Sequence, residues 1–328
     1  MAKKNSNENA GKKRKKKRSG LKNLLIFLAV LAIVLGGGWY VIVNSLYQKM
    51  SYTEIESVKA AAVKEAGVTN ILLIGNDSRD NGEDGRSDAM ILLSISDKTK
   101  TIQMNSLLRD MYVEIPGHGG NRLNAAYAYG GAQLLMETIE RNLGIEVNRY
   151  VQVNFEAFAN VVDAADGVEL ELTNDEVQLV NGYLVEYNML TGKPEGTDYL
   201  DSSASGMLHL NGPQALAYTR NRYIGTDFGR TERQRKVLSA VIKKLPTALI
   251  KNPGQLVDGL VSNLNTNLTS GECYRLSFQA WKLVGYQLVQ GSIPRDGTWQ
   301  DATINGMAVL QVDFDANREY LSSSIYGE

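Results

Sequence analysis

The chain has 328 residues and a formal net charge of −1 at pH 7, with 35 Lys or Arg and 36 Asp or Glu. Its single cysteine, Cys273, excludes an internal disulfide. With only two histidines, His118 and His209, the composition excludes a Cys/His zinc cluster and gives no support to a Ser-His-Asp triad, so any metal must be held by oxygen ligands.

A basic tail occupies the first 22 residues, with ten Lys or Arg and one Glu. Such a run cannot bury apolar surface, and we expect it to be disordered. It is basic enough to bind RNA or DNA, but its position beside an apolar segment favours a role in membrane topology and contact with anionic lipid.

The next segment, 24–43, contains 20 residues without a charge. As a helix it is about 30 Å long, enough to cross a bilayer. We predict a transmembrane signal anchor at 23–44; a cleaved signal peptide is the alternative, but no small-residue cleavage site follows. The positive-inside rule then places the N-terminus in the cytoplasm and the rest outside the cell, as in a single-pass protein of the cell membrane.

The part of the chain after the tail is acidic, with 25 basic and 35 acidic side chains. Nucleic-acid binding depends on a basic surface, so we expect no nucleic-acid partner. A polar connector at 45–67 precedes a region long enough for one large domain. We predict a catalytic domain at 68–245 and, at 246–328, an extension of helices and a strand packed on it.

Short apolar runs predict strands, and a helical spacing of apolar residues follows them. The predicted strands are 69–77, 89–97 and 101–108, and the predicted helix at 124–144 is broken by Gly130 and Gly131 and ended by Gly144. Strand, helix and strand alternate again over 150–172. The sequence therefore predicts an α/β domain with a mixed central sheet covered by helices on both sides.

Two carboxylates fall where predicted strands meet loops. Asp77 follows the first strand and Asp88 opens the second. Neighbouring strands lie about 4.8 Å apart, so the two carboxylates can converge on one ion, and two carboxylates with phosphate oxygens commonly hold Mg²⁺. Arg86 and Arg109 add cations near this rim. For each aspartate alone, ordinary turn chemistry is the alternative.

Positive charge is concentrated at 209–236, which holds five arginines and Lys236 against two acidic residues. In an extended segment, Arg220 and Arg222 would project to one side. Arginine fits a phosphate better than lysine does because its planar fork offers paired donors. A diphosphate is the ligand that this pattern favours.

A helix opening near Asp227 would place Arg230, Arg233 and Gln234 on one face. The alternative for this helix is a solvated face stabilised by pairs such as Glu232 with Lys236.

Seven ordered segments resemble the LytR-CpsA-Psr family: GNDSR (75–79), RSDAM (86–90), LLRDMYVEIPG (107–117), RLNAAYAYGG (122–131), DGVEL (166–170), LNGPQALAYTRNR (210–222) and DFGRTERQRKVL (227–238). The similarity covers about residues 68–245. A short cytoplasmic tail with one membrane span is also usual in that family.

The resemblance implies an extracytoplasmic phosphotransferase. Such enzymes move a glycopolymer, for example a teichoic acid or capsular polysaccharide, from an undecaprenyl diphosphate carrier to a muramic acid hydroxyl of peptidoglycan, forming a phosphodiester. Position by position, the resemblance assigns Mg²⁺ to Asp77 and Asp88, and diphosphate contacts to Arg86, Arg109, Arg220, Arg222, Arg230 and Gln234. Asp77, Asp88, Arg86 and Arg109 are then the catalytic residues.

Two other functions use the same residues. A polyprenyl diphosphate hydrolase would replace the sugar hydroxyl by water, and a non-catalytic membrane-anchored regulator of envelope assembly would only bind an anionic polymer. The residue that accepts the proton of the acceptor hydroxyl is not assigned. Asp77 or Asp88 could take it, but a carboxylate bound to magnesium is a weak base.

Several segments depart from the family pattern or lie outside it. Leu108 stands where the family has Pro, a change that should alter the strand end more than the charge. The long polar segment 181–207 is either a lid that shapes acceptor choice or a passive loop. Helices 124–144 and 155–166 either wall a polyprenyl slot or form ordinary core.

In the C-terminal part we predict helices at 247–265 and 272–289, a strand at 309–313, and a final helix capped by Asp315. The segment 292–299 is predicted to be a turn.

Overall fold

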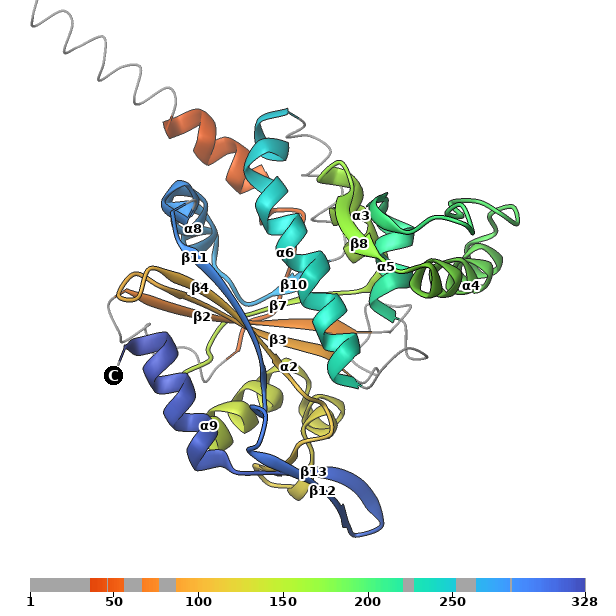
Figure 1. The fold of residues 1–328 in the computed structure, drawn as a ribbon. Coiled ribbons are helices and arrows are strands. Elements are labelled where there is room, and N and C mark those ends of the chain that lie inside the picture. Colours follow the sequence, from red (N-terminus) through yellow and green to blue (C-terminus); the bar gives the residue numbers. More distant parts are fainter. Residues whose placement is uncertain are drawn as a thin grey trace, which may run out of the picture.

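The computed structural model describes residues 36–45, 47–55, 67–76, 87–220, 227–251, 264–283 and 285–327 (Figure 1). The basic tail and the predicted anchor up to residue 35 lie outside the described residues. Within the described ranges, none of the helices is both long enough and apolar enough to span a membrane.

A seven-stranded mixed sheet forms the centre of the molecule, in the order β1-β10-β7-β2-β3-β4-β11. Its strands are β1 (Ser51–Tyr52), β2 (Val68–Asn76), β3 (Ser87–Ser96), β4 (Thr101–Leu107), β7 (Tyr150–Val153), β10 (Leu264–Thr266) and β11 (Gln287–Ile293). Strands β2, β3 and β4 are antiparallel neighbours, whereas β7 runs parallel to β2 and β11 parallel to β4. The predicted mixed α/β architecture is confirmed.

Helices cover both faces of this sheet (Figure 1). One face packs on α2 (Leu123–Leu143), α9 (Phe314–Leu321) and the π-helical turn Ser322–Tyr326, with Leu72, Ile74 and Leu92 fully buried between them. The other face lies under α6 (Asp227–Lys251) and α8 (Ser270–Leu283).

The predicted breaks in the helix at 124–144 are present. Gly130 and Gly131 leave the helical conformation, and Gly131 has φ 60° and ψ −155°, which a residue with a Cβ adopts only with strain. Gly144 ends α2 in the left-handed conformation and donates its backbone N–H to the carbonyl of Glu140.

A second hydrophobic cluster forms beside the sheet. It joins a two-stranded sheet, β8 (Val168–Leu172) and β9 (Gly206–Leu210), to the helices α3 (Phe155–Ala164), α4 (Asn174–Thr191) and α5 (Gly212–Arg220). Thr173 and Glu176 form a capping box that starts α4.

The segment 181–207 is largely ordered by this unit, and the expectation of a structureless insertion is wrong. Its first eleven residues, 181–191, belong to α4. The following loop is tied back to the helix, because Asn188 donates to the carbonyl of Thr197 at 2.8 Å and Asn181 donates to that of Leu200 at 2.9 Å.

The C-terminal predictions need three corrections. Of the predicted helix 247–265, residues 247–251 are the last of α6, residues 252–263 lie outside the described part of the chain, and residues 264–265 belong to β10. Helix α8 ends at Leu283, so that 287–293 can pair with the open edge of β4 as β11. Asp313 rather than Asp315 caps α9, because its side chain accepts from the backbone N–H of Ala316. The turn within 292–299 is present between β11 and β12.

Two hairpins lie at one end of the sheet. The first pairs β5 (Tyr112–Ile115) with β6 (Gly119–Arg122), and the second pairs β12 (Trp299–Ile304) with β13 (Met307–Val312), which includes most of the predicted strand. The second hairpin projects at the bottom of Figure 1.

The described N-terminal helix, residues 36–45, packs on α8 (Figure 1). The Trp39 indole N–H donates to Ser277 Oγ at 3.1 Å, and the Tyr40 and Tyr274 rings meet edge to face at 5.7 Å. The last part of the predicted anchor, residues 36–44, therefore packs against the C-terminal extension.

Candidate functional site

The site is built around Asp227, the first residue of α6. Arg109, just after β4, places Nη2 at 3.2 Å from Asp227 Oδ2, and Arg230, one helical turn further on, places Nη2 at 3.5 Å from Oδ1. The Arg230 residue is only 3% exposed. One carboxylate thus brings together two of the arginines that the sequence analysis singled out.

A second carboxylate, Asp110, extends this cluster. Its oxygens lie 3.5 Å from Arg109 Nε and 3.5 Å from Arg122 Nε, and its side chain is hydrogen-bonded to Asp227. Burial raises the pKa of Asp110, against the opposing effect of Arg109 and Arg122. Burial also acts to raise the pKa of Asp227, but Arg230 and Arg109 outweigh it and hold that pKa below its usual value.

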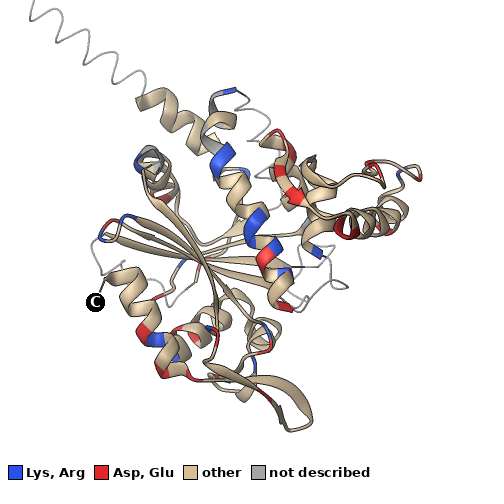
Figure 2. Ribbon diagram, in the orientation of Figure 1, with Lys and Arg blue, Asp and Glu red and all other residues tan. Residues whose placement is uncertain are grey.

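The basic residues of α6 divide into a buried and an exposed face. Arg230, Arg233 and Arg235 are all buried, which contradicts the solvated-face alternative for them. The Glu232–Lys236 pair, at 2.9 Å, occupies the exposed face, as that alternative predicted. Figure 2 shows charged residues at intervals along the whole of α6.

Arg235 anchors α6 on the sheet. Its Nη1 donates to Ser106 Oγ on β4 at 2.7 Å, and burial lowers its pKa. Spacing and charge alone do not separate Arg235 from its neighbours. Gln234 is partly exposed, and its Oε1 is buried without a hydrogen-bond partner among the residues described.

Arg220 is the last residue of α5, so the predicted extended segment is wrong at this position. Pro213 near the start of the segment favours a helix, which continues through Arg220. The Tyr183 hydroxyl donates to the Arg220 carbonyl at 2.8 Å, and the guanidinium carbon lies 5.9 Å from the centre of the Tyr183 ring.

Three predicted site residues, Asp77, Arg86 and Arg222, lie outside the described part of the chain. Asp88 lies on β3 at a register shift: Ala89 pairs with Gly75 and Ser87 with Asn76, so Asp88 is the extra residue of a β-bulge. Bulges redirect side chains and recur next to active sites. Gly75 is needed opposite the bulge, since a Cβ there would lie 3.0 Å from the Cβ of Ala89.

The magnesium prediction rests on Asp77 and Asp88. Among the residues that the structure describes, no group of three or more His, Cys, Asp or Glu is arranged to hold a metal. Two carboxylates and substrate oxygens remain the predicted ligand set.

Leu108 has a structural role that proline cannot fill. Its backbone N–H donates to the carbonyl of Ile293 at 2.9 Å, which adds a hydrogen bond beyond the paired residues of β4 and β11. Proline lacks this donor. The presence of Leu108 in place of proline therefore stabilises the end of β4, directly before Arg109.

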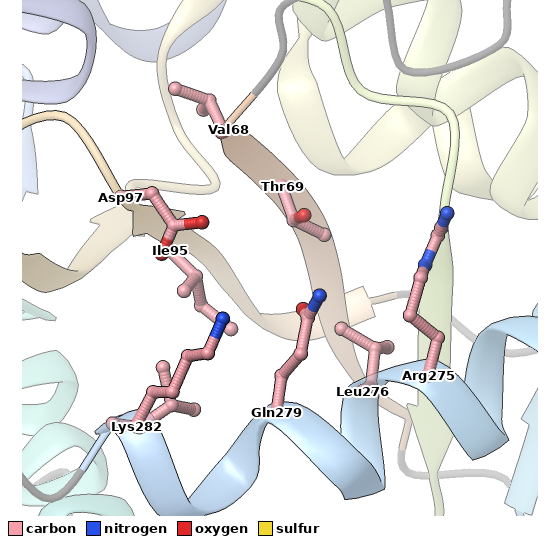
Figure 3. Close-up of a pocket in the computed structure, with 10 residues that line it drawn as sticks. Val68, Thr69, Ile95, Asp97, Arg275, Leu276, Gln279 and Lys282 are labelled. Atoms are coloured by element: carbon pink, nitrogen blue, oxygen red, sulfur yellow. The ribbon is translucent and has the colours of Figure 1, made fainter.

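The sheet face under α6 and α8 is incompletely covered. Leu73, Leu93 and Ile95 are partly exposed there, in contrast to the fully buried residues of the opposite face. A pocket of about 200 Å³ opens between Ile95 and α8. Figure 3 shows Leu276, Gln279 and Lys282 of α8 directed towards β2 and the end of β3, with Arg275 at the edge of the pocket.

Helices α2 and α3 form ordinary core instead. Tyr127 of α2 is 2% exposed, and Val162 of α3 is fully buried. The partly open apolar surface under α6 and α8 was missed from the sequence, since it depends on how the two helices are spaced.

A further pocket, of about 280 Å³, adjoins the arginine cluster. It is lined by Leu107, Leu108, Arg109, Asp110, Asp227, Phe228, Arg230, Thr231, Trp299, Asp301 and Leu310. The Trp299 ring stacks on that of Phe228 with a centroid distance of 5.1 Å. Asp110 and Asp227 could have been singled out, because each stands in a motif beside an arginine; Trp299 and Asp301 carried no such signal.

Comparison with known proteins decides the family. The LytR_cpsA_psr family model matches residues 40–323. The chain belongs to this family. The match is longer than the resemblance at 68–245 and includes most of the C-terminal extension, with the hairpin β12–β13.

Two kinds of relative of this LytR_cpsA_psr protein are informative. The polyisoprenyl-teichoic acid–peptidoglycan teichoic acid transferase TagU of Enterococcus faecalis (strain ATCC 700802 / V583) is 32% identical over 298 residues, covering 88% of this chain and 89% of that one. The structure of TagT bound to LI-WTA has a TM-score of 0.63 and 29% identity, covering 81% of this chain and 95% of that one. TagT (YwtF) with bound octaprenyl pyrophosphate lipid has a TM-score of 0.59 and 27% identity, with the same coverage.

The depressed pKa of Asp227 predicts a pH-dependent contribution to stability. The ionised carboxylate stabilises the folded protein above the unfolded-state pKa of about 3.9, and this contribution is lost as the pH falls through the lower folded-state value. The free energy of unfolding of the full chain should therefore exceed that of Asp227→Asn most at pH 7, and the difference should shrink below about pH 4. Asp296→Asn, on an exposed turn, is the matched control; a difference for Asp227→Asn that is constant from pH 7 to pH 2.5 would contradict the ion pairs.

Proposed function

We propose that this protein is a membrane-anchored phosphotransferase that moves a glycopolymer from an undecaprenyl diphosphate carrier to peptidoglycan outside the cell. The observation that carries the proposal is the convergence of Arg109 and Arg230 on Asp227. It is supported by relatives named teichoic acid transferases and by structural neighbours that hold LI-WTA or octaprenyl pyrophosphate lipid.

The arginine cluster suits the charge of a diphosphate. Phosphoryl transfer requires mainly that the phosphate is positioned and that charge on its outer oxygens is neutralised. Arg109 and Arg230 are both held by Asp227, so an arriving phosphate meets guanidinium groups that are already oriented. In this proposal Arg86, Arg220, Arg222 and Gln234 complete the diphosphate contacts.

The reaction exchanges one phosphorus–oxygen bond for another. The oxygen of an acceptor sugar hydroxyl forms a bond to the phosphorus that carries the glycopolymer. The bond from that phosphorus to the bridging oxygen breaks, and the carrier leaves as undecaprenyl phosphate. The hydroxyl proton passes to a base; Asp110 lines the adjacent pocket, and its raised pKa suits a proton acceptor better than the depressed pKa of Asp227 does.

The polyprenyl chain has a suitable surface on the sheet. Leu73, Leu93 and Ile95 are partly exposed beneath α6 and α8. Helix α8 also contacts residues 36–45, which overlap the end of the predicted anchor. This arrangement supports entry of the lipid from the membrane side.

The topology of the proposal has a direct test. An alkaline phosphatase fusion after residue 60 should be active, because the enzyme folds only outside the cytoplasm, whereas a fusion within the basic tail should be inactive. An inactive fusion after residue 60, with the fusion protein present in the membrane fraction, would contradict an extracellular catalytic domain.

Magnesium at Asp77 and Asp88 is part of the proposal and would supply positive charge to the diphosphate oxygens. We expect chelation by EDTA to abolish transfer of labelled glycopolymer to peptidoglycan and added Mg²⁺ to restore it.

Asp88→Ala should lose most of the activity, while Asp296→Ala, an exposed aspartate, should keep it. A regulator without catalytic activity would retain its function in Asp88→Ala.

The geometry of Arg230 gives a second prediction. Arg230→Lys keeps the charge but loses the planar fork, so the transfer rate should fall by about 10²-fold, as for loss of a preorganised donor. Lys236→Ala, on the exposed face of the same helix, is the control and should stay near the wild-type rate.

Assays with and without peptidoglycan separate the transferase from the hydrolase, because only the hydrolase releases glycopolymer phosphate at full rate without acceptor.

A further inference from the structure

The pocket beside the arginine cluster has a wall that comes from the C-terminal extension. The hairpin β12–β13 contributes Trp299, Asp301 and Leu310, and α6 contributes Phe228 and Thr231. We call this space the hairpin pocket. It shares Arg109 and Arg230 with the residue set that the family resemblance assigns to the diphosphate. Its other lining residues do not belong to that set.

The hairpin is held firmly against the site. Arg122 donates from Nη2 and Nε to the carbonyl of Ala308 at 2.6 and 3.1 Å, and the same guanidinium faces Asp110. The backbone N–H of Leu310 donates to the carbonyl of Asp110 at 2.9 Å. The wall of the hairpin pocket is therefore fixed to the chain segment that carries Arg109.

The lining of the hairpin pocket combines an aromatic surface with hydrogen-bond acceptors. Trp299 is partly exposed, and its ring orientation is set by stacking on Phe228. Asp110 and Asp301 offer carboxylate oxygens, and Thr231 offers a hydroxyl. A pyranose ring fits this combination, because its C–H face can lie on an aromatic surface while its hydroxyls donate to carboxylates.

The charge of the hairpin pocket indicates which part of the substrate it binds. The lining carries three carboxylates against two guanidinium groups, and both guanidinium groups are paired with Asp227, so Asp110 and Asp301 disfavour an additional phosphate of an anionic polymer. The polyprenyl chain has its own apolar surface under α6 and α8. What remains next to the reacting phosphorus is a neutral sugar.

We propose that the hairpin pocket binds one pyranose ring directly beside the diphosphate, with Trp299 as its stacking surface and Asp301 as a hydroxyl acceptor. The proposal rests on the proposed function, since a glycopolymer transferase brings a sugar to each side of the reacting phosphate. The ring is either the first sugar of the glycopolymer or the acceptor sugar of peptidoglycan. Both have the same chemistry, and the kinetics of the two substrates distinguish them.

The test uses the full-length protein with a short-chain polyprenyl diphosphate disaccharide as donor and a soluble peptidoglycan oligosaccharide as acceptor, each varied in turn. Trp299→Ala and Asp301→Asn should raise the KM for one of the two substrates by up to about tenfold, with a smaller change in kcat. Trp299→Phe should recover most of the loss, because it restores an aromatic ring. Gln300→Ala is the matched control, since its side chain lies between these two in β12 and pairs with Gln311 on the exposed surface.

The outcomes are separable. A raised acceptor KM assigns the pocket to peptidoglycan, and a raised donor KM assigns it to the first sugar of the polymer. If both KM values stay at the wild-type level in Asp301→Asn and in folded Trp299→Ala, or if only kcat falls, the pocket binds no sugar and the proposal is overturned. Asp301→Asn carries the test alone if Trp299→Ala fails to fold. Absence of transfer by the wild-type protein would instead overturn the proposed function.

Discussion

The ion pairs of Asp227 with Arg109 and Arg230 are the constraint on which the rest of the site depends. A guanidinium as deeply buried as that of Arg230 is costly without an anion, and removal of one partner from such a pair is strongly destabilising. Asp227 supplies the anion at the first turn of α6, where the helix dipole also favours a negative charge. The carboxylate thus fixes α6 to the end of β4 and orients the two guanidinium groups.

How much of the fold could be predicted depends on how local its contacts are. Strands β2, β3 and β4 are consecutive antiparallel neighbours, and their apolar runs with a short turn between β3 and β4 predicted them well. The strands β10 and β11 were not predicted, and residues 264–265 and 287–289 were assigned to helices, because these short segments become strands only by pairing with β7 and β4, which are remote in sequence. Helices α4 and α9 start at Thr173 and Asp313, whose side chains accept from the third backbone N–H of each helix. Neighbouring polar residues such as Asp315 could cap a helix equally well, so the sequence alone did not locate the start of α9.

The candidate site shows the same division. The family motifs named Arg109 and Arg230, and the structure joins them through a carboxylate that the motifs also contain but that periodicity alone did not mark. Arg235 has the same charge as its neighbours, yet only its position opposite Ser106 shows that it anchors the helix. Trp299 reaches the site because the extension folds back over β5, a contact between segments far apart in the chain for which a single sequence carries no signal.

The position of β11 at the edge of the sheet has a consequence for the order of assembly. The outer edge of β4 gains its partner only when residues 287–293 are available, and β7 gains its outer partner from residues 264–266. Until these residues have been made, the chain presents two unpaired strand edges. Such edges are templates for association with other chains. The sheet is therefore completed by segments that come late in the chain, and a truncation that removes β11 would expose the edge of β4, the strand that leads into Arg109.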